Sequence, residues 1–141
     1  MKNTFLRKPF RYSFNNAALI IIAINIGVFM LTSMNPTLKT YLSLNVFLVL
    51  EKHMYFEFFT YMFTHANFYH LLGNMLGVLF FGTSVERAIG SKEFVLMYLL
   101  IGLLCGVVSF AVYFFSGMYL TFLLGASGSV YAILLMYAVI Y

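Results

Sequence analysis

The chain has 141 residues, of which 63% are hydrophobic and only 9% are charged. A soluble globular domain is about 45–50% apolar and about 25% charged, so this chain has too few polar side chains to cover a water-exposed surface. The composition excludes a disordered chain, a collagen-like fibre and a cytosolic α/β enzyme, and it predicts an integral membrane protein.

The charged residues are unevenly distributed along the chain. Eight Lys and Arg residues against four acidic ones give a formal charge of +4, and four of these cations precede the first long apolar segment: Lys2, Arg7, Lys8 and Arg11. Nucleic-acid binding requires basic side chains along one folded face, whereas cations ahead of an apolar segment orient a membrane helix. We therefore expect residues 1–16 to form a cytoplasmic basic segment and expect no nucleic-acid partner.

Four apolar segments are predicted to be membrane helices, at about 17–34, 68–85, 94–115 and 120–141. They are long and lack the alternation of barrel strands. The first, at ~1.5 Å per residue, reaches ~27 Å, close to the ~30 Å hydrocarbon thickness. A cleaved signal peptide is the alternative for this segment, although its length exceeds the usual ~7–15 apolar residues and no small-x-small site follows it. Residues 17–141 are thus expected to form one membrane domain.

The segments between the predicted spans suggest a topology. Residues 35–67 mix charged and aromatic side chains, which is typical of the headgroup zone, so we expect this loop to lie on the membrane surface, partly as short helices. With a cytoplasmic N-terminus, this loop faces outward. The charged turn containing Glu86, Arg87 and Lys92 then falls on the cytoplasmic side, as the positive-inside rule requires.

The sequence Gly125-Ala126-Ser127-Gly128 contains a candidate nucleophile. A serine that attacks a carbonyl needs an exposed Oγ and unpaired backbone N–H groups nearby, and flanking glycines permit a close substrate approach. If the helix begins at Ser127, its first N–H groups have no intrahelical acceptor and face the developing oxyanion. The alternative is that these small residues only let two membrane helices pack closely.

Two polar residues near the start of the second span are candidates for the same site. His70 and Asn74 are four residues apart, ~40° around a helix, so both project from one face. With the predicted topology, they lie about 3 and 9 Å into the membrane, and Ser127 about 10 Å, at 1.5 Å per residue from Phe68 and Leu120. The alternative is an interhelical hydrogen-bonded pair without a catalytic role.

Other features have structural explanations. His65, five residues before His70, would lie ~140° away on a helix, and no cysteine or carboxylate is adjacent, so we expect no metal. The pairs Gly73-x-x-x-Gly77 and Gly102-x-x-x-Gly106 predict close helix packing. Tyr131 alone is a core or interface aromatic, Cys105 a small hydrophobic residue that cannot form an internal disulfide, and Glu86-Arg87 a solvated turn.

Together, the motifs His65-x4-His70-x3-Asn74, Glu86-Arg87 and Gly125-Ala126-Ser127-Gly128-x2-Tyr131 resemble those of the rhomboid family of intramembrane serine proteases. The resemblance covers about 85 to 90 residues, from the second half of the first loop onward. It implies an all-α membrane protein, a rhomboid-like polytopic helical bundle of which four of six expected spans are present.

The resemblance also implies roles for these residues. Ser127 would be the nucleophile, and His70 and Asn74 would form the oxyanion hole with the Ser127 N–H. Tyr131 would lie against the catalytic histidine, and His65 would be structural. Glu86 and Arg87 would tie loops together on the cytoplasmic side.

The chain departs from the family pattern in two places. The Trp-Arg pair of many bacterial rhomboids is replaced by Met54-Tyr-Phe-Glu-Phe-Phe59, and no histidine follows Ser127, whereas rhomboids use a Ser–His dyad whose histidine lies on the sixth span. Without that general base the 141 residues are expected to be inactive, because loss of one dyad partner costs on the order of 10⁶ in kcat. We expect the sequence to be truncated at its C-terminus.

The expected function is cofactor-free cleavage of transmembrane segments of membrane proteins, in a bacterial inner membrane. A derlin-like, non-catalytic relative that binds transmembrane helices is the main alternative. A transporter fragment is a third possibility, but it predicts inverted repeats that the sequence does not display.

Overall fold

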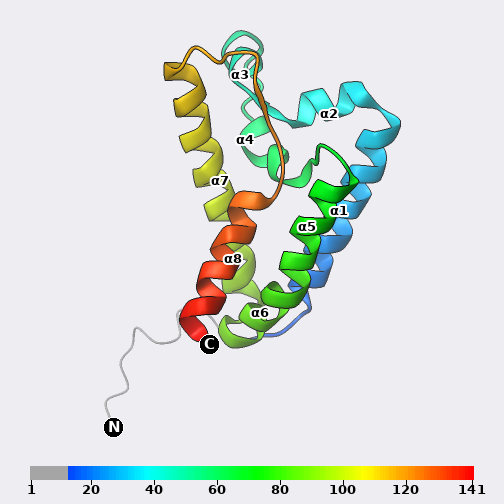
Figure 1. The fold of residues 1–141 in the computed structure, drawn as a ribbon, viewed down its shortest axis with the longest axis vertical. Helices are drawn as coiled ribbons and strands as arrows, with labels where there is room; N and C mark the ends of the chain where they lie inside the picture. The colour runs from blue at the N-terminus through cyan, green and yellow to red at the C-terminus, as the bar shows by residue number, and fades with distance from the viewer. Residues whose placement is uncertain (1–12) are drawn as a thin grey trace.

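The computed structural model describes residues 13–141, so the predicted N-terminal cations at positions 2, 7, 8 and 11 lie outside the described residues. The fold is a bundle of helices with short helices at one end (Figure 1). Its helices are α1 (Ala17–Met34), α2 (Pro36–Leu42), α3 (Val46–Lys52), α4 (Glu57–Thr60), α5 (Phe68–Gly77), α6 (Thr83–Ile89), α7 (Ser91–Phe115) and α8 (Ser127–Ile140). A 3-10 turn η2 (Tyr61–Phe63), a π-helical segment η3 (Val78–Gly82) and two short strands, β1 (Leu44–Asn45) and β2 (Phe122–Leu123), complete the fold.

Three helices in the described part of the chain are long and apolar enough to cross a membrane. They are Ala17–Met34, the continuous run Phe68–Ile89 formed by α5, η3 and α6, and Ser91–Phe115. Their outward surfaces carry large exposed hydrophobic side chains, which only a lipid environment accommodates over such an area. The prediction of an all-helical membrane bundle is therefore confirmed.

The second and third helices are longer than predicted at the turn that joins them. The second continues to Ile89, so Glu86 and Arg87 lie within α6, and Gly90, with φ 98°, ends it before α7 begins at Ser91. Glu86 is fully buried, and its two carboxyl oxygens accept the N–H groups of Ala17 and Ala18 at 2.7 and 2.9 Å and the Ser91 hydroxyl. The interpretation of Glu86 as part of a solvated turn is wrong, because it caps the first turn of α1.

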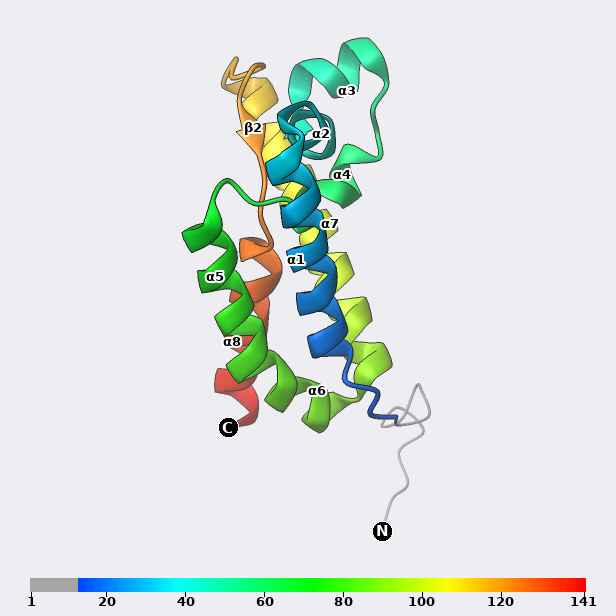
Figure 2. The same cartoon turned by 90° about the vertical axis from the view of Figure 1, so that its right-hand side faces the viewer.

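The long first loop folds into short helices at the end of the bundle opposite the start of α1 and the end of α8 (Figure 2). Asn35 and Asn45 begin two of these helices, each accepting a backbone N–H three residues later, and Pro36 occupies the first position of α2. These are ordinary start signals for helices. The sequence did not reveal β1, which pairs antiparallel with β2, Leu44 opposite Leu123.

The fourth helix begins later than predicted. Its predicted start was near Leu120, but residues 120–126 are not helical, because β2 hydrogen-bonds to β1 and Gly125 adopts a φ of 115°. α8 starts at Ser127 and has 14 residues, which at ~1.5 Å per residue is ~21 Å, short of the ~30 Å hydrocarbon thickness. The extended segment carries the chain from the C-terminal end of α7 to the middle of the bundle (Figure 1).

Glycines set how closely the helices pack. A Cβ built on Gly77 would come within 2.7 Å of Val130, one on Gly102 within 2.8 Å of Met62 and Ser129, and one on Gly106 within 2.8 Å of Tyr61. For these three glycines the structure agrees with the predicted close-packing role. Gly73 differs, because nothing lies within 4 Å of the position that its Cβ would occupy.

Candidate active site

A cleft of about 390 Å³ lies between α5 and α8, and it contains the predicted site residues. It is lined by Tyr69, His70, Gly73, Asn74, Ser127, Val130, Tyr131 and Leu134. His70, Asn74, Ser127 and Tyr131, predicted from distant parts of the sequence, therefore share one cavity. Gly73 faces this open space, which explains why it does not pack against a neighbouring helix.

Ser127 is the first residue of α8 and is half-buried at the cleft. The first hydrogen bond of the helix joins the Val130 N–H to the Ala126 carbonyl at 2.9 Å, so the N–H groups of Ser127 and Gly128 precede it, and no side chain caps the helix. Such N–H groups are available to a negatively charged oxygen. Within residues 13–141 the Ser127 hydroxyl has no hydrogen-bond partner, so no general base is engaged with it.

His70 rests against the backbone of Gly125. A Cβ on Gly125 would lie 2.5 Å from Cε1 and 2.7 Å from Nε2 of His70, so only glycine leaves room for the imidazole. The Gly125 φ of 115° also favours glycine, and its N–H donates to the Tyr61 carbonyl at 3.0 Å. The segment before Ser127 is thus fixed between the first loop and the His70 ring.

Asn74 is almost fully buried and lies one turn below His70. Its Nδ2 donates to the His70 backbone carbonyl at 2.7 Å, a bond within α5. In the part of the chain that the structure describes, neither side chain hydrogen-bonds to another helix, as the alternative of an interhelical pair would require. The second N–H of the Asn74 amide has no acceptor in residues 13–141 and remains available to a ligand in the cleft.

His65 lies in the loop before α5, so the helical angle assumed for it does not apply. Its imidazole is fully buried, neither ring nitrogen has a hydrogen-bond partner within residues 13–141, and its ring is 5.2 Å from that of His70. Burial, and then the neighbouring His70, lower the pKa of His65 to about 4, so it is neutral at pH 7. His65 packs behind His70 and does not line the cleft.

The remaining predicted residues lie around Ser127. Ala126 is buried, and Gly128 contacts α7 closely, since a Cβ there would lie 2.8 Å from the Cys105 sulfur. Tyr131 projects into the cleft with 71% of its surface exposed. In the described residues no three side chains of the His, Cys, Asp or Glu type are grouped as metal ligands.

Sequence reasoning missed several residues that shape the site. The Tyr61 carbonyl holds Gly125, and its hydroxyl donates to the Gly102 carbonyl, so one side chain connects the first loop to α7. Tyr69 lines the cleft with 82% of its surface exposed. Both belong to a stretch rich in aromatic residues, in which nothing local distinguishes a site residue from its neighbours.

Two comparisons with known proteins show what the chain is similar to. Residues 52–141, more than half of the chain, match the family model described as Rhomboid domain. A 66-residue stretch is 35% identical to RHOMBOID-like protein 1 of Arabidopsis thaliana. That stretch is 47% of this chain but only 17% of the relative's length.

Proposed function

This chain belongs to the rhomboid family, and from that premise we propose that it acts as an intramembrane serine endopeptidase on transmembrane segments of membrane proteins. The observation that carries the proposal is the shared cleft, in which Ser127 of α8 lies opposite His70 and Asn74 of α5. A serine hydroxyl, free helix N–H groups and a side-chain amide around one cavity are the elements of an acyl-transfer site.

The proposed reaction begins with attack of Ser127 Oγ on a substrate peptide carbonyl. The new C–O bond gives a tetrahedral intermediate, and its oxyanion accepts hydrogen bonds from the Ser127 N–H, the free Asn74 N–H and the His70 ring. The C–N bond then breaks, the leaving amine takes up the proton lost by Ser127, and water hydrolyses the acyl-enzyme.

The proton must be held in transit by a general base. Within residues 13–141 nothing is hydrogen-bonded to the Ser127 hydroxyl, and His65 is buried behind His70. The family resemblance implies that this base is a histidine that the 141 residues do not include, as proposed for the whole protein.

The cleft suits a substrate that is extended at the scissile bond. Gly73, which has no side chain, leaves space in the cleft, and the exposed rings of Tyr69 and Tyr131 add apolar surface to the walls of the cleft. A transmembrane helix that unwinds locally would present its carbonyl to Ser127 and lay adjacent side chains against these rings.

We also propose a bacterial inner membrane and a cytoplasmic N-terminus. The orientation is supported by Arg87 and Lys92, which lie close in sequence to Ser91, whose N–H donates to the Ser13 carbonyl at 2.8 Å just before α1. Four further cations, at positions 2, 7, 8 and 11, precede Ser13 in the sequence. The positive-inside rule assigns the side of the membrane on which Arg87 and Lys92 lie to the cytoplasm.

The test is cleavage of a reporter transmembrane substrate in cells that express the complete reading frame. Ser127→Ala is expected to reduce cleavage on the order of 10⁶-fold, to background. His70→Ala and Asn74→Ala are each expected to cost about 10²–10³-fold, typical for loss of one oxyanion donor. Ser84→Ala in α6, the same change at the far end of the bundle, should cleave normally.

Two results contradict the proposal. Cleavage by Ser127→Ala at the parental rate removes Ser127 as nucleophile. A parent protein that retains reporter helices in pull-downs but never cleaves them supports the non-catalytic, derlin-like function instead.

A further inference from the structure

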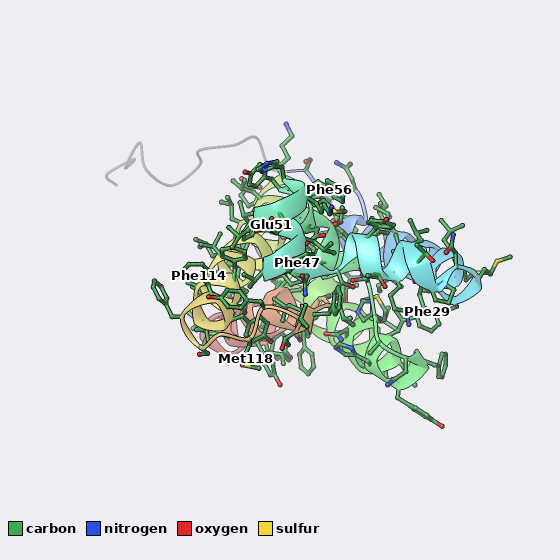
Figure 3. The ribbon with its side chains drawn as sticks, turned by 90° about the horizontal axis from the view of Figure 1, so that it is seen from above. Phe29, Phe47, Glu51, Phe56, Phe114 and Met118 are labelled. Atoms are coloured by element: carbon green, nitrogen blue, oxygen red, sulfur yellow. The ribbon has the colours of Figure 1, made fainter. Side chains whose placement is uncertain are left out.

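A second hollow, of about 360 Å³, opens at the other end of the bundle, between α3 and the outer end of α7. It is lined by Phe47, Leu50, Glu51, Phe114 and Tyr119. The view from above shows Phe47 and Glu51 on α3 near Phe114 on α7 (Figure 3). None of these residues lines the cleft around Ser127, so this is a separate site.

Aromatic rings form the walls of this hollow. Phe114 and Tyr119 meet edge to face, with ring centroids 5.9 Å apart and an interplanar angle of 82°. Phe47 faces the hollow from α3, and its N–H donates to the Tyr119 carbonyl at 3.2 Å, which fixes the two sides relative to each other. All three side chains are 37–43% exposed, so their rings are accessible to a ligand.

Glu51 adds a negative charge to these walls. Its side chain is exposed and has no salt bridge or hydrogen bond within residues 13–141, whereas the nearby His53 is engaged with the Tyr55 hydroxyl at 3.1 Å. Ring faces attract cations, and a carboxylate beside them strengthens the attraction. Rings with a single carboxylate suit an organic cation rather than a metal ion, which would need several oxygen or nitrogen ligands.

The surface next to the hollow indicates what kind of molecule carries the cation. Three apolar residues of α7 lie on the same face as Phe114, because they precede it by 7, 11 and 14 residues: Val107, Leu103 and Leu100. These three side chains are 48%, 38% and 49% exposed, and they form an apolar stripe that leads from the hollow along the membrane-spanning length of α7. A cation with attached hydrocarbon chains fits both parts, and the ends of spanning helices lie at the level of the lipid headgroups.

We propose that this hollow binds the ammonium headgroup of a zwitterionic phospholipid, with the acyl chains of the lipid along the stripe of α7. The ammonium lies against the rings of Phe47, Phe114 and Tyr119 and is neutralised by the Glu51 carboxylate. This inference does not rest on the proposed protease activity.

The experiment is native mass spectrometry of the full protein released from nanodiscs that contain equal amounts of phosphatidylcholine, phosphatidylethanolamine and phosphatidylglycerol. The parent is expected to retain the two ammonium lipids in preference to phosphatidylglycerol. Glu51→Gln and Phe47→Leu are each expected to lower that retention about three- to tenfold, which corresponds to about 0.7–1.4 kcal/mol and is within the range of cation–π contacts. Glu93→Gln, the same charge change near the opposite end of α7, should leave it unchanged.

Far-ultraviolet circular dichroism of each variant checks that the helices are retained, and Glu51 is exposed, so its replacement by glutamine leaves no cavity. Equal retention of all three lipids by the parent overturns the proposal, as does unchanged retention in Glu51→Gln. Binding of a soluble lysine-containing peptide that depends on Glu51, without any headgroup preference, would assign the hollow to a protein partner and also overturn it.

Discussion

Gly125 is the residue whose replacement should disturb the candidate active site most directly. Gly125→Ala forces an L residue into a φ of 115° and places a Cβ 2.5 Å from the His70 ring. The backbone strain alone costs about 1–3 kcal/mol, and the displaced imidazole adds to it. We expect lower thermal stability in detergent micelles and, in the complete protein, loss of reporter cleavage.

The matched control is Gly117→Ala. Gly117 also has a positive φ, of 71°, but nothing lies within 4 Å of the added Cβ. It therefore reports backbone strain without the clash. If both variants lose the same stability and cleave equally, the contact between Gly125 and His70 does not position the imidazole.

The buried carboxyl group of Glu57 should make the stability of the protein depend on pH. Its carboxyl group, in α4, is fully buried, with one oxygen accepting the Asn45 N–H at 2.9 Å and the other without a partner in the described residues. Burial raises the pKa of Glu57 from 4.5 to about 7. Between these two pH values the folded state binds more protons than the unfolded state, so this residue lowers the free energy of unfolding as pH rises from 4.5 to 7.

The measurement is chemical unfolding of the parent and of Glu57→Gln between pH 4 and 8. The free energy of unfolding of the parent minus that of the variant should fall by about 3 kcal/mol across that interval, given ~1.4 kcal/mol per pKa unit. His65, whose pKa is lowered to about 4, acts with the opposite sign and cancels from the difference because both proteins contain it. Glu51→Gln, a change at an exposed residue of α3, should show the same pH dependence of the free energy of unfolding as the parent. If the difference between parent and Glu57→Gln does not change with pH, the Glu57 carboxyl group has an ordinary pKa.

At the scale of elements, α1 depends on a side chain from α6. Glu86→Ala leaves the N–H groups of Ala17 and Ala18 and the Ser91 hydroxyl without their buried acceptor. Unsatisfied buried donors of this kind are expected to cost about 2–4 kcal/mol in total. Glu86→Gln retains one acceptor oxygen and should lose less, and thermal unfolding in micelles measures both.

Glu93→Ala provides the comparison for this prediction. Glu93 lies in the first turn of α7, half-buried, and its Oε2 has no partner in the described residues, so its removal should cost little. Equal destabilisation by the two alanine variants would mean that Glu86 does not hold the start of α1.

The same elements explain how far sequence reasoning reached. Long apolar segments identify α1 and α7 because burial in lipid requires uninterrupted hydrophobicity, and the i, i+4 spacing places His70 and Asn74 on one face. The start of α8 could not be located in this way. Residues 120–126 are as apolar as a helix would require, and their extended form depends on the pairing of Phe122 with Asn45, 77 residues earlier. Likewise, Glu86 appears solvated until α1 is known to begin against it.

At the scale of the whole molecule, the first loop and the extended segment work as one support for the candidate site. The Asn45 N–H donates to the Glu57 carboxyl group, and its side-chain amide donates to the Thr121 carbonyl at 3.1 Å. The Tyr61 carbonyl accepts the Gly125 N–H. These contacts join the outer surface of the bundle to Ser127, which lies deeper. The residues that present the nucleophile are therefore spread over the part of the chain that joins α1 to α5.

The orientation of the bundle in the membrane predicts which side of the membrane each loop faces. If the N-terminus is cytoplasmic, Lys92, beside the start of α1, lies on the cytoplasmic side and His53, after α3, lies on the outer side. In a Cys105→Ala background, Lys92→Cys and His53→Cys each provide one exposed thiol. A membrane-impermeant maleimide applied to intact cells should label position 53 and should label position 92 only after the membrane is permeabilised.

The Cys105→Ala protein without an added cysteine measures background labelling. The reverse pattern places the first loop in the cytoplasm and inverts the side from which the cleft admits a substrate, whereas labelling of both positions in intact cells is incompatible with α7 crossing the membrane.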